Sequence, residues 1–191
     1  TRKPAGSLEG IDVASSRGVE EQLDQHLHAV ALRTALERLP ESIGSMRNLR
    51  WLDAAINRLS SLPDELGNLY DLEQLELGHN LLVELPAPVL RMTNLVRLEL
   101  LGNEFESLPS AIGTLTTLTR LDLRLNHLAQ VPTQLAQLTA LRALLLDHNQ
   151  LVKLPPQLTR LCNAREVCVG YNQLQKLPQF GSSMTDRKSV V

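Results

Sequence analysis

Aromatic residues make up only 3% of this chain of 191 residues, and cysteine occurs only twice. With so few rings, most of the core volume has to come from aliphatic side chains, which belong to a hydrophobic fraction of 43%. Two cysteines do not provide the dense disulfide framework of a small secreted domain. The cysteine usage therefore favours a reducing compartment, and we expect a cytoplasmic protein.

Charge of one sign, long apolar runs and catalytic motifs are also missing. The chain has 19 basic and 21 acidic residues, a net charge of −2, which gives no electrostatic drive toward nucleic acid. The apolar runs are a handful of residues long, whereas a membrane-spanning helix needs about 20. The phosphate-binding glycine loop, the H-E-x-x-H motif and the nucleophile elbow are all absent. We expect no nucleic-acid partner, no membrane insertion, no enzymatic activity, no cofactor and no metal.

What the chain does have is a repeat of 23 residues. Six units follow the pattern L-x-x-L-x-L-x-x-N-x-L-x-x-L-P or a close variant of it. These six repeats start near residues 49, 72, 95, 118, 141 and 164. A seventh, weaker unit starts near residue 26, with Ala29 and Ala31 at leucine positions and Thr34 at the asparagine position.

Each position of the repeat has a physical interpretation. Side chains alternate in x-L-x-L-x, so this segment predicts a short strand whose leucines face one way and are buried by stacking neighbours. The asparagine amide suits the following turn, because it can pair with backbone groups that the turn leaves open. Stacked asparagines predict a structural ladder: Asn57, Asn80, Asn103, Asn126, Asn149 and Asn172. Leu-Pro then indicates an extended segment, followed by a helical turn or two along the outer face.

These residues resemble the leucine-rich repeat signature over residues 26–186. The LP-x-x-I/L-G-x-L form, in LPESIGSM, LPDELGNL and LPSAIGTL, is similar to the 23-residue class, which occurs in Ras-pathway scaffolds, polarity scaffolds and bacterial effectors. The resemblance implies an α/β fold, a right-handed β-α solenoid of about seven repeats. It also implies a parallel sheet on the concave side and short helical turns on the convex side. For a secreted bacterial effector, the expected location becomes the host cytoplasm.

The two ends depart from the repeat. Residues 1–25 are expected to form a flexible N-terminus with a short capping helix over about 17–26, because a solenoid needs its terminal core covered. The alternative is that this helix continues through HLHAVALRTALERL. Residues 187–191 are interpreted as a tail or a truncated eighth repeat. Two alternatives follow for this end: the domain continues in a longer protein, or Phe180 and Met184 form a makeshift lid.

The positions between the leucines display the residues that remain for function. The central position of four consecutive strands carries a carboxylate, with three arginines nearby and with Trp51 and Tyr171 as aromatic anchors. The candidate partner-binding residues are Trp51, Asp53, Glu76, Arg97, Glu99, Arg120, Asp122, Arg124 and Tyr171. One interpretation is a docking stripe for a basic or mixed-charge segment of a partner. The other is a solvated mixed-charge face without a purpose of its own.

Further positions on the same side carry weaker hypotheses. The position before each asparagine holds, in order, Ile56, His79, Gly102, Leu125, His148 and Tyr171. His127, Asp147 and His148 invite a metal-site interpretation, but three ligands without a fourth make a poor zinc site. Cys168 faces outward without a basic neighbour at a fixed offset, so we interpret it as an unreactive thiol.

Two functional hypotheses follow. The first is a monomeric, non-enzymatic protein-protein interaction module that binds another protein through its concave face. The alternative is the targeting or substrate-recognition domain of a larger protein, such as a bacterial secreted effector, whose catalytic domain lies outside this chain. A purely structural solenoid that binds nothing is a third possibility.

Overall fold

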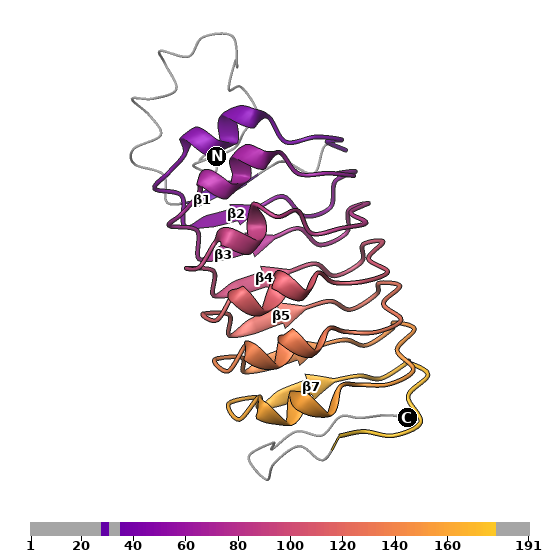
Figure 1. Cartoon of the computed structure of the whole chain (residues 1–191). Coiled ribbons are helices and arrows are strands. Elements are labelled where there is room, and N and C mark those ends of the chain that lie inside the picture. The colour runs from indigo at the N-terminus through magenta and orange to yellow at the C-terminus, as the bar shows by residue number, and fades with distance from the viewer. Residues whose placement is uncertain (1–27, 31–34, 179–191) are drawn as a thin grey trace, which may run out of the picture.

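One short strand per repeat forms a seven-stranded parallel sheet (Figure 1). The computed structural model describes the backbone of residues 28–30 and all of residues 35–178. The strands are β1 (His28–Val30), β2 (Trp51–Asp53), β3 (Gln74–Glu76), β4 (Arg97–Glu99), β5 (Arg120–Asp122), β6 (Ala143–Leu145) and β7 (Glu166–Cys168). They lie side by side in the order of the sequence, so the predicted leucine-rich repeat solenoid is confirmed.

The strands pair in a register of 23 residues along the whole sheet. Leu52 pairs with Leu75, and Leu75 in turn pairs with Leu98. The weak first unit keeps this register, because His28 of β1 pairs with Trp51 of β2. Residues 28–30 are therefore a strand, and the alternative of a helix running through this segment is wrong.

The hydrophobic core is formed by the leucines whose side chains point away from the exposed side of the sheet. In β2 to β5 the middle residue of each strand is a leucine with 0% exposure. Phe105 is also fully buried, at a position that other repeats fill with leucine, so one aromatic ring contributes to an otherwise aliphatic core. We call each 23-residue repeat of the solenoid a rung. Each strand buries its leucine against the neighbouring rungs, as a stacked solenoid requires.

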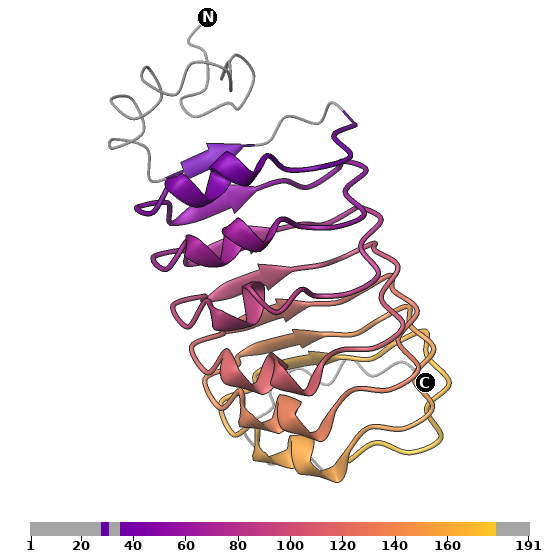
Figure 2. The same cartoon turned by 45° about the horizontal axis from the view of Figure 1, so that its top comes forward.

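Short 3₁₀ helices return along the opposite side of each repeat (Figure 2). They are η1 (Glu41–Ser45), η2 (Asp64–Asn68), η3 (Val89–Arg91), η4 (Ser110–Thr114), η5 (Thr133–Gln137) and η6 (Pro156–Arg160). The repeat proline directly precedes five of them and is extended, with φ −69° and ψ 146° at Pro40. The exception is η3, because Pro88 there is helical and the helix has only three residues.

Small residues let neighbouring 3₁₀ helices approach closely. A Cβ at Gly67 of η2 would lie 2.7 Å from the Cβ of Pro88, which is too close for real atoms. A Cβ at Gly44 of η1 would overlap the carbonyl oxygen of Glu65. The glycine of the LP-x-x-I/L-G motif is thus required by contact between rungs.

The asparagines form a continuous ladder of hydrogen bonds. The Oδ1 atom of Asn103 accepts from the Leu82 N–H of the preceding repeat at 3.0 Å. Its Nδ2 group donates to the carbonyl oxygens of Leu77 and Leu100, each at 3.0 Å. The same pattern recurs at Asn80, Asn126 and Asn149. The ladder ties each turn to the one before it and fixes the backbone that follows every strand.

Several expectations about the ends lie outside the described residues. These are the capping helix over 17–26, the lid of Phe180 and Met184, and the tail of residues 187–191. None of the described helices has the length and apolar character needed to cross a bilayer.

Candidate strand-face binding site

We use the term strand face for the side of the sheet that carries the residues flanking the buried middle residue of each strand from β2 to β7. Parallel pairing places Asp53 beside Glu76, Glu76 beside Glu99, and Glu99 beside Asp122. Adjacent strands lie about 4.8 Å apart, so these carboxylates form one row across four strands. The first three side chains are half-buried, and we call Asp53, Glu76 and Glu99 the carboxylate row.

Asp122 is aligned with this row but is not exposed, which corrects its place in the predicted docking stripe. Its side chain is 1% exposed. Arg124 donates to both carboxylate oxygens, at 2.9 Å to Oδ1 and 2.6 Å to Oδ2. Arg120 lies 3.8 Å from Oδ2 on the other side. Two guanidinium groups thus cover Asp122, and a partner could reach it only by displacing them.

Arg120 joins the carboxylate row to the far end of the sheet. Its guanidinium lies 3.4 Å from Glu99 and 3.9 Å from Glu166. Arg124 is held by Asp122, and this hydrogen bond raises the pKa of Arg124. Both arginines are about one-third exposed and are neutralised by carboxylates of the chain itself. The strand face around them is consequently balanced in charge and fixed in geometry.

The carboxylate row has less compensation of this kind. Within residues 35–178, neither Asp53 nor Glu76 has a salt bridge. Burial raises the pKa of Glu76, and repulsion from Asp53 and Glu99 raises it further. The charge of Arg97 and a hydrogen bond from Trp51 act in the opposite direction. A cation brought to this row would therefore relieve repulsion that the chain compensates only in part.

The predicted aromatic anchors lie at opposite ends of the strand face. Trp51 in β2 is half-buried, and its interaction with Glu76 lowers the pKa of that carboxyl, so the Trp51 side chain lies beside the carboxylate row. Tyr171 is 72% exposed and stacks on His148, with ring centroids 4.1 Å apart and planes 7° from parallel. The alternative role that the sequence allows for Trp51 is to pack over Ala29 and Ala31 of the alanine-lined first repeat, but these side chains lie outside the described residues. The structure thus does not bring the two anchors together.

The three residues of the weak metal hypothesis have separate partners. His127 lies 3.4 Å from Glu104, and Asp147 accepts the Gly170 N–H at 2.8 Å. His148 is occupied by its stack on Tyr171. Among the described residues, no group of three potential ligands is arranged to hold a metal ion.

The two cysteines are not disulfide-bonded. Burial raises the pKa of the Cys168 thiol to about 11, with further contributions from Asp147 and Glu166. A thiol with this pKa is almost entirely protonated at neutral pH, and the thiolate is the reactive form. Cys168 therefore contributes surface to the strand face and is a poor nucleophile.

The sequence did not predict the backbone conformation at the position before each asparagine. All six residues there have positive φ: Ile56 57°, His79 55°, Gly102 67°, Leu125 53°, His148 55° and Tyr171 52°. We call these six residues the left-handed row. Glycine, as at Gly102, signals this conformation most clearly, histidine is moderately enriched in it, and for a β-branched residue such as Ile56 it is unusual.

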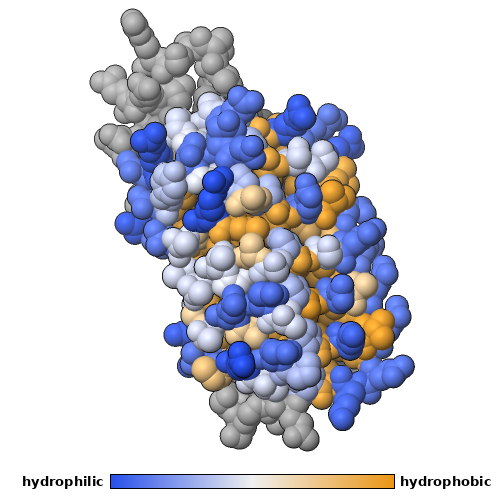
Figure 3. All heavy atoms as spheres, viewed as in Figure 1, coloured by the Kyte–Doolittle hydropathy of each residue, from blue (hydrophilic) through white to orange (hydrophobic). Residues whose placement is uncertain are grey.

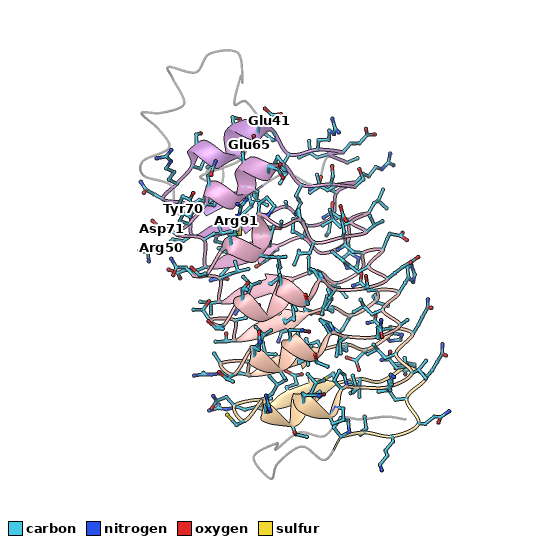
Figure 4. The ribbon with its side chains drawn as sticks, in the orientation of Figure 1. Glu41, Arg50, Glu65, Tyr70, Asp71 and Arg91 are labelled. Atoms are coloured by element: carbon cyan, nitrogen blue, oxygen red, sulfur yellow. The ribbon has the colours of Figure 1, made fainter. Side chains whose placement is uncertain are left out.

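The helix side offers no comparable alignment. Figure 3 shows hydrophobic residues there interspersed with hydrophilic ones. The residues labelled in Figure 4 come from η1 to η3 and the turns after η1 and η2, and include both signs of charge. Arg50 forms an exposed salt bridge with Glu73 at 3.3 Å, which contributes little by itself. The strand face remains the better candidate site.

Comparison with known proteins agrees with this architecture. The model of the leucine-rich repeat region matches residues 25–122, about half of the chain. Together with the repeating fold, this match shows that the chain belongs to the leucine-rich repeat family. No curated protein of significantly similar sequence was found.

Solved structures with the same repeat architecture come from several organisms. A leucine-rich repeat protein of Leptospira interrogans is 33% identical, with a TM-score of 0.63, over 75% of this chain and 43% of that one. The ectodomain of the Arabidopsis thaliana receptor kinase GASSHO1/SCHENGEN3, solved with CASPARIAN STRIP INTEGRITY FACTOR 2, is 30% identical, with a TM-score of 0.65, over 74% and 18%. An internalin of Listeria monocytogenes shares the fold at 18% identity, with a TM-score of 0.69, over 89% and 56%. The chain spans less than two thirds of each of these proteins.

Proposed function

We propose that this chain is a non-enzymatic protein-binding module that recognises a protein partner through its strand face. Leucine-rich repeat domains are commonly protein-protein interaction modules, and one of the similar structures is a receptor ectodomain in complex with another molecule. The observation that carries the proposal is the alignment of half-buried carboxylates, with Trp51 beside them, on a regular and rigid sheet.

Electrostatics favour a partner surface with basic residues. Three positions of each repeat from β2 to β7 face outward: the first and the last residue of the strand, and the second residue after it. At these positions acidic residues outnumber basic ones two to one. Two of the three arginines are already paired with acidic side chains of the chain. A basic partner segment would approach along a favourable field and would offset the repulsion within the carboxylate row. Trp51 would supply apolar contact area, and tryptophan is enriched among interface residues that dominate binding energy.

The test compares three proteins in affinity capture followed by mass spectrometry. The first is the wild type, and the second is the double variant Glu76→Lys, Glu99→Lys. The third is the matched control Glu41→Lys, Asp71→Lys, which makes the same change in net charge on the helix side (Figure 4). Circular dichroism and urea unfolding establish that all three are folded. Partners retained by the wild type and the control but lost by the strand-face variant support the proposal. Identical partner sets for all three proteins would refute it.

A further inference from the structure

The left-handed row presents bulky side chains at a backbone conformation that disfavours them. Ile56 is 45% exposed, Leu125 47% and Tyr171 72%, so three of the eight exposed large hydrophobic residues of the described chain lie in this row. The left-handed conformation costs least for glycine and asparagine and most for branched or bulky residues. The row thus presents an apolar surface at positions where solvent exposure favours polar residues and the left-handed backbone favours glycine or asparagine.

The two histidines of the row lean onto their neighbours on the next rung. A Cβ at Gly102 would lie 2.6 Å from Nδ1 of His79, so the imidazole of His79 covers that glycine. His148 stacks on Tyr171 in the same direction along the row. The surface of the row therefore consists of Ile56, the imidazole of His79 over Gly102, Leu125, and the stacked pair of His148 and Tyr171.

The carboxylate row runs parallel to the left-handed row. Asp53 precedes Ile56 by three residues on the same rung, and Glu76 and Glu99 precede His79 and Gly102 in the same way. Three extended residues span at most about 10 Å, so the two rows are separated by less than the diameter of an α-helix with its side chains. One helix lying across the strands can therefore contact both rows.

The spacing of the rungs distinguishes a helical partner from an extended one. Successive rungs are about 4.8 Å apart. On one face of an α-helix, side chains three or four residues apart are separated by about 4.5–6 Å along the axis, which matches the rungs. Side chains on one face of an extended strand are about 6.6 Å apart and lose register after two rungs.

We propose that the occupant of the strand face is an amphipathic α-helix of the partner, lying across the strands. Its apolar stripe contacts Ile56 and Leu125 and packs over the imidazole of His79 between them, and basic residues along one flank contact Asp53, Glu76 and Glu99. This inference rests on the proposed function and specifies the partner of the same site. A helix of about 10 residues covers the four rungs from Ile56 to Leu125, and about 16 residues reach Tyr171.

The test uses two displayed peptide libraries selected against the full chain. Library one encodes 18-residue helical peptides with leucine at i, i+3, i+4 and i+7 and lysine along one flank, with the other positions random. Library two is identical except for prolines at two central positions, which prevent an α-helix. The affinities of selected peptides are then measured against the wild type and variants by isothermal titration calorimetry.

The variant for the apolar row is Ile56→Asn, Leu125→Asn, because asparagine tolerates the left-handed conformation and preserves the fold. Its matched control is Leu81→Asn, Val152→Asn, which removes side chains of 47% and 50% exposure outside the row. We expect selected helical peptides to lose at least about tenfold in affinity on the row variant, from the apolar area withdrawn. The affinity of the same peptides for the control variant, and the affinity of the proline-containing peptides for the wild type, are the values with which this loss is compared.

Each result separates the inference from the proposed function. Helical peptides that bind the wild type, weaken on the row variant, and weaken on Glu76→Lys, Glu99→Lys support both. If only proline-containing peptides are selected, and Glu76→Lys, Glu99→Lys abolishes their binding, the strand face is a binding site but the helical partner is refuted. Helical peptides whose affinity is the same for the row variant and its control also refute the inference. If neither library yields a binder sensitive to any strand-face variant, both proposals fail.

Discussion

Replacing one central asparagine of the ladder should have a cost that follows from its hydrogen bonds. In Asn103→Ala, the Leu82 N–H loses its acceptor, which the structure places at 3.0 Å. The carbonyl oxygens of Leu77 and Leu100 lose one donor each, but each keeps a second amide, from Asn80 and Asn126 respectively. Only one backbone group is therefore left without a partner.

The expected magnitude follows from that one group. A buried backbone N–H without an acceptor costs about 1–3 kcal/mol, so we expect Asn103→Ala to lower the free energy of unfolding by about 2 kcal/mol. The matched control is Asn94→Ala, because the exposed Asn94 makes one hydrogen bond, to the Tyr70 carbonyl at 2.9 Å. Losing a single exposed hydrogen bond should cost about 0.5 kcal/mol.

Aspartate at the same position distinguishes hydrogen bonding from side-chain volume. In Asn103→Asp, the carboxylate still accepts from Leu82, but it faces the carbonyl oxygens of Leu77 and Leu100 with no proton to donate. Asn103 is only 5% exposed, so the carboxylate would also be a buried charge. At pH 7, Asn103→Asp should thus be less stable than Asn103→Ala, although it is nearly isosteric with the wild type. The gap should narrow at acidic pH, where the protonated side chain can donate.

Urea unfolding followed by far-UV circular dichroism measures all three variants. With a slope of about 2 kcal/mol/M, the loss expected for Asn103→Ala moves the midpoint by about 1 M. Slopes equal to that of the wild type are required before midpoints are compared. Equal midpoints for Asn103→Ala and Asn94→Ala, or an Asn103→Asp variant as stable as the wild type at pH 7, would refute the account of the ladder.

Three further predictions concern single positions. Gly67→Ala places a Cβ 2.7 Å from Pro88 and should cost about 1–3 kcal/mol in urea unfolding, whereas Gly78→Ala, with 3.4 Å to its nearest neighbour, should cost less. Equal costs would contradict the predicted contact between helices. Glu76→Gln should raise the free energy of unfolding at pH 7, because the raised pKa of Glu76 means that its ionised form opposes folding. This gain should vanish below pH 4.5, where the carboxyl of the unfolded chain is protonated as well. A midpoint of urea unfolding that is unchanged at pH 7 would contradict this prediction. Iodoacetamide at pH 7 should label the exposed Cys162 well before Cys168, whose thiolate fraction at a pKa of about 11 is on the order of 10⁻⁴. Mass spectrometry that finds both sites labelled equally fast would show that Cys168 is less protected than the structure indicates.

The repeat architecture could be predicted from sequence because each position carries the same physical requirement in every rung. Leu75 and Asn80 are predictable for the same reason as Leu98 and Asn103, and a period of 23 residues allows only one register between neighbouring strands. Even the weak first unit follows this constraint, since β1 pairs with β2 in the register of the others. Residues 28–30 therefore form a strand through pairing with the next repeat, although the sequence of this segment also allowed a helix.

The candidate site was only partly predictable, because alternation determines the side of the sheet but not the surroundings of a side chain there. Asp122 occupies the same position as Glu99, yet it is buried because Arg124, two residues further on, folds back over it. The next strand contributes Leu145 beside Asp122, so the row of charges ends there. Burial of Asp122 therefore depends on one rotamer and one neighbour, neither of which the repeat specifies.

The left-handed row could not be predicted from residue types either. Its backbone conformation is imposed by the turn into the asparagine ladder, and five of its six residues are not glycine. The irregular η3 also departs from the pattern: Leu90 stands where η1, η2 and η4 have glycine, and the residue directly before η3 is the helical Pro88 and not the repeat proline Pro86. In the left-handed row the recurring turn keeps one backbone conformation while the residue type varies from repeat to repeat.

The separation between fold-determining and surface positions decides which variants can report on binding. Asp53, Glu76 and Glu99 are half-buried and, apart from the contact of Glu99 with Arg120, are not held in salt bridges within residues 35–178, so changing them alters the surface more than the fold. Arg124 is different, because removing its side chain would leave the buried carboxylate of Asp122 with only the backbone N–H of residue 124 and the longer contact to Arg120. A loss of binding in an Arg124 variant would therefore mix instability with recognition. The carboxylate row and the left-handed row are the positions at which a change in partner affinity can be assigned to the surface itself.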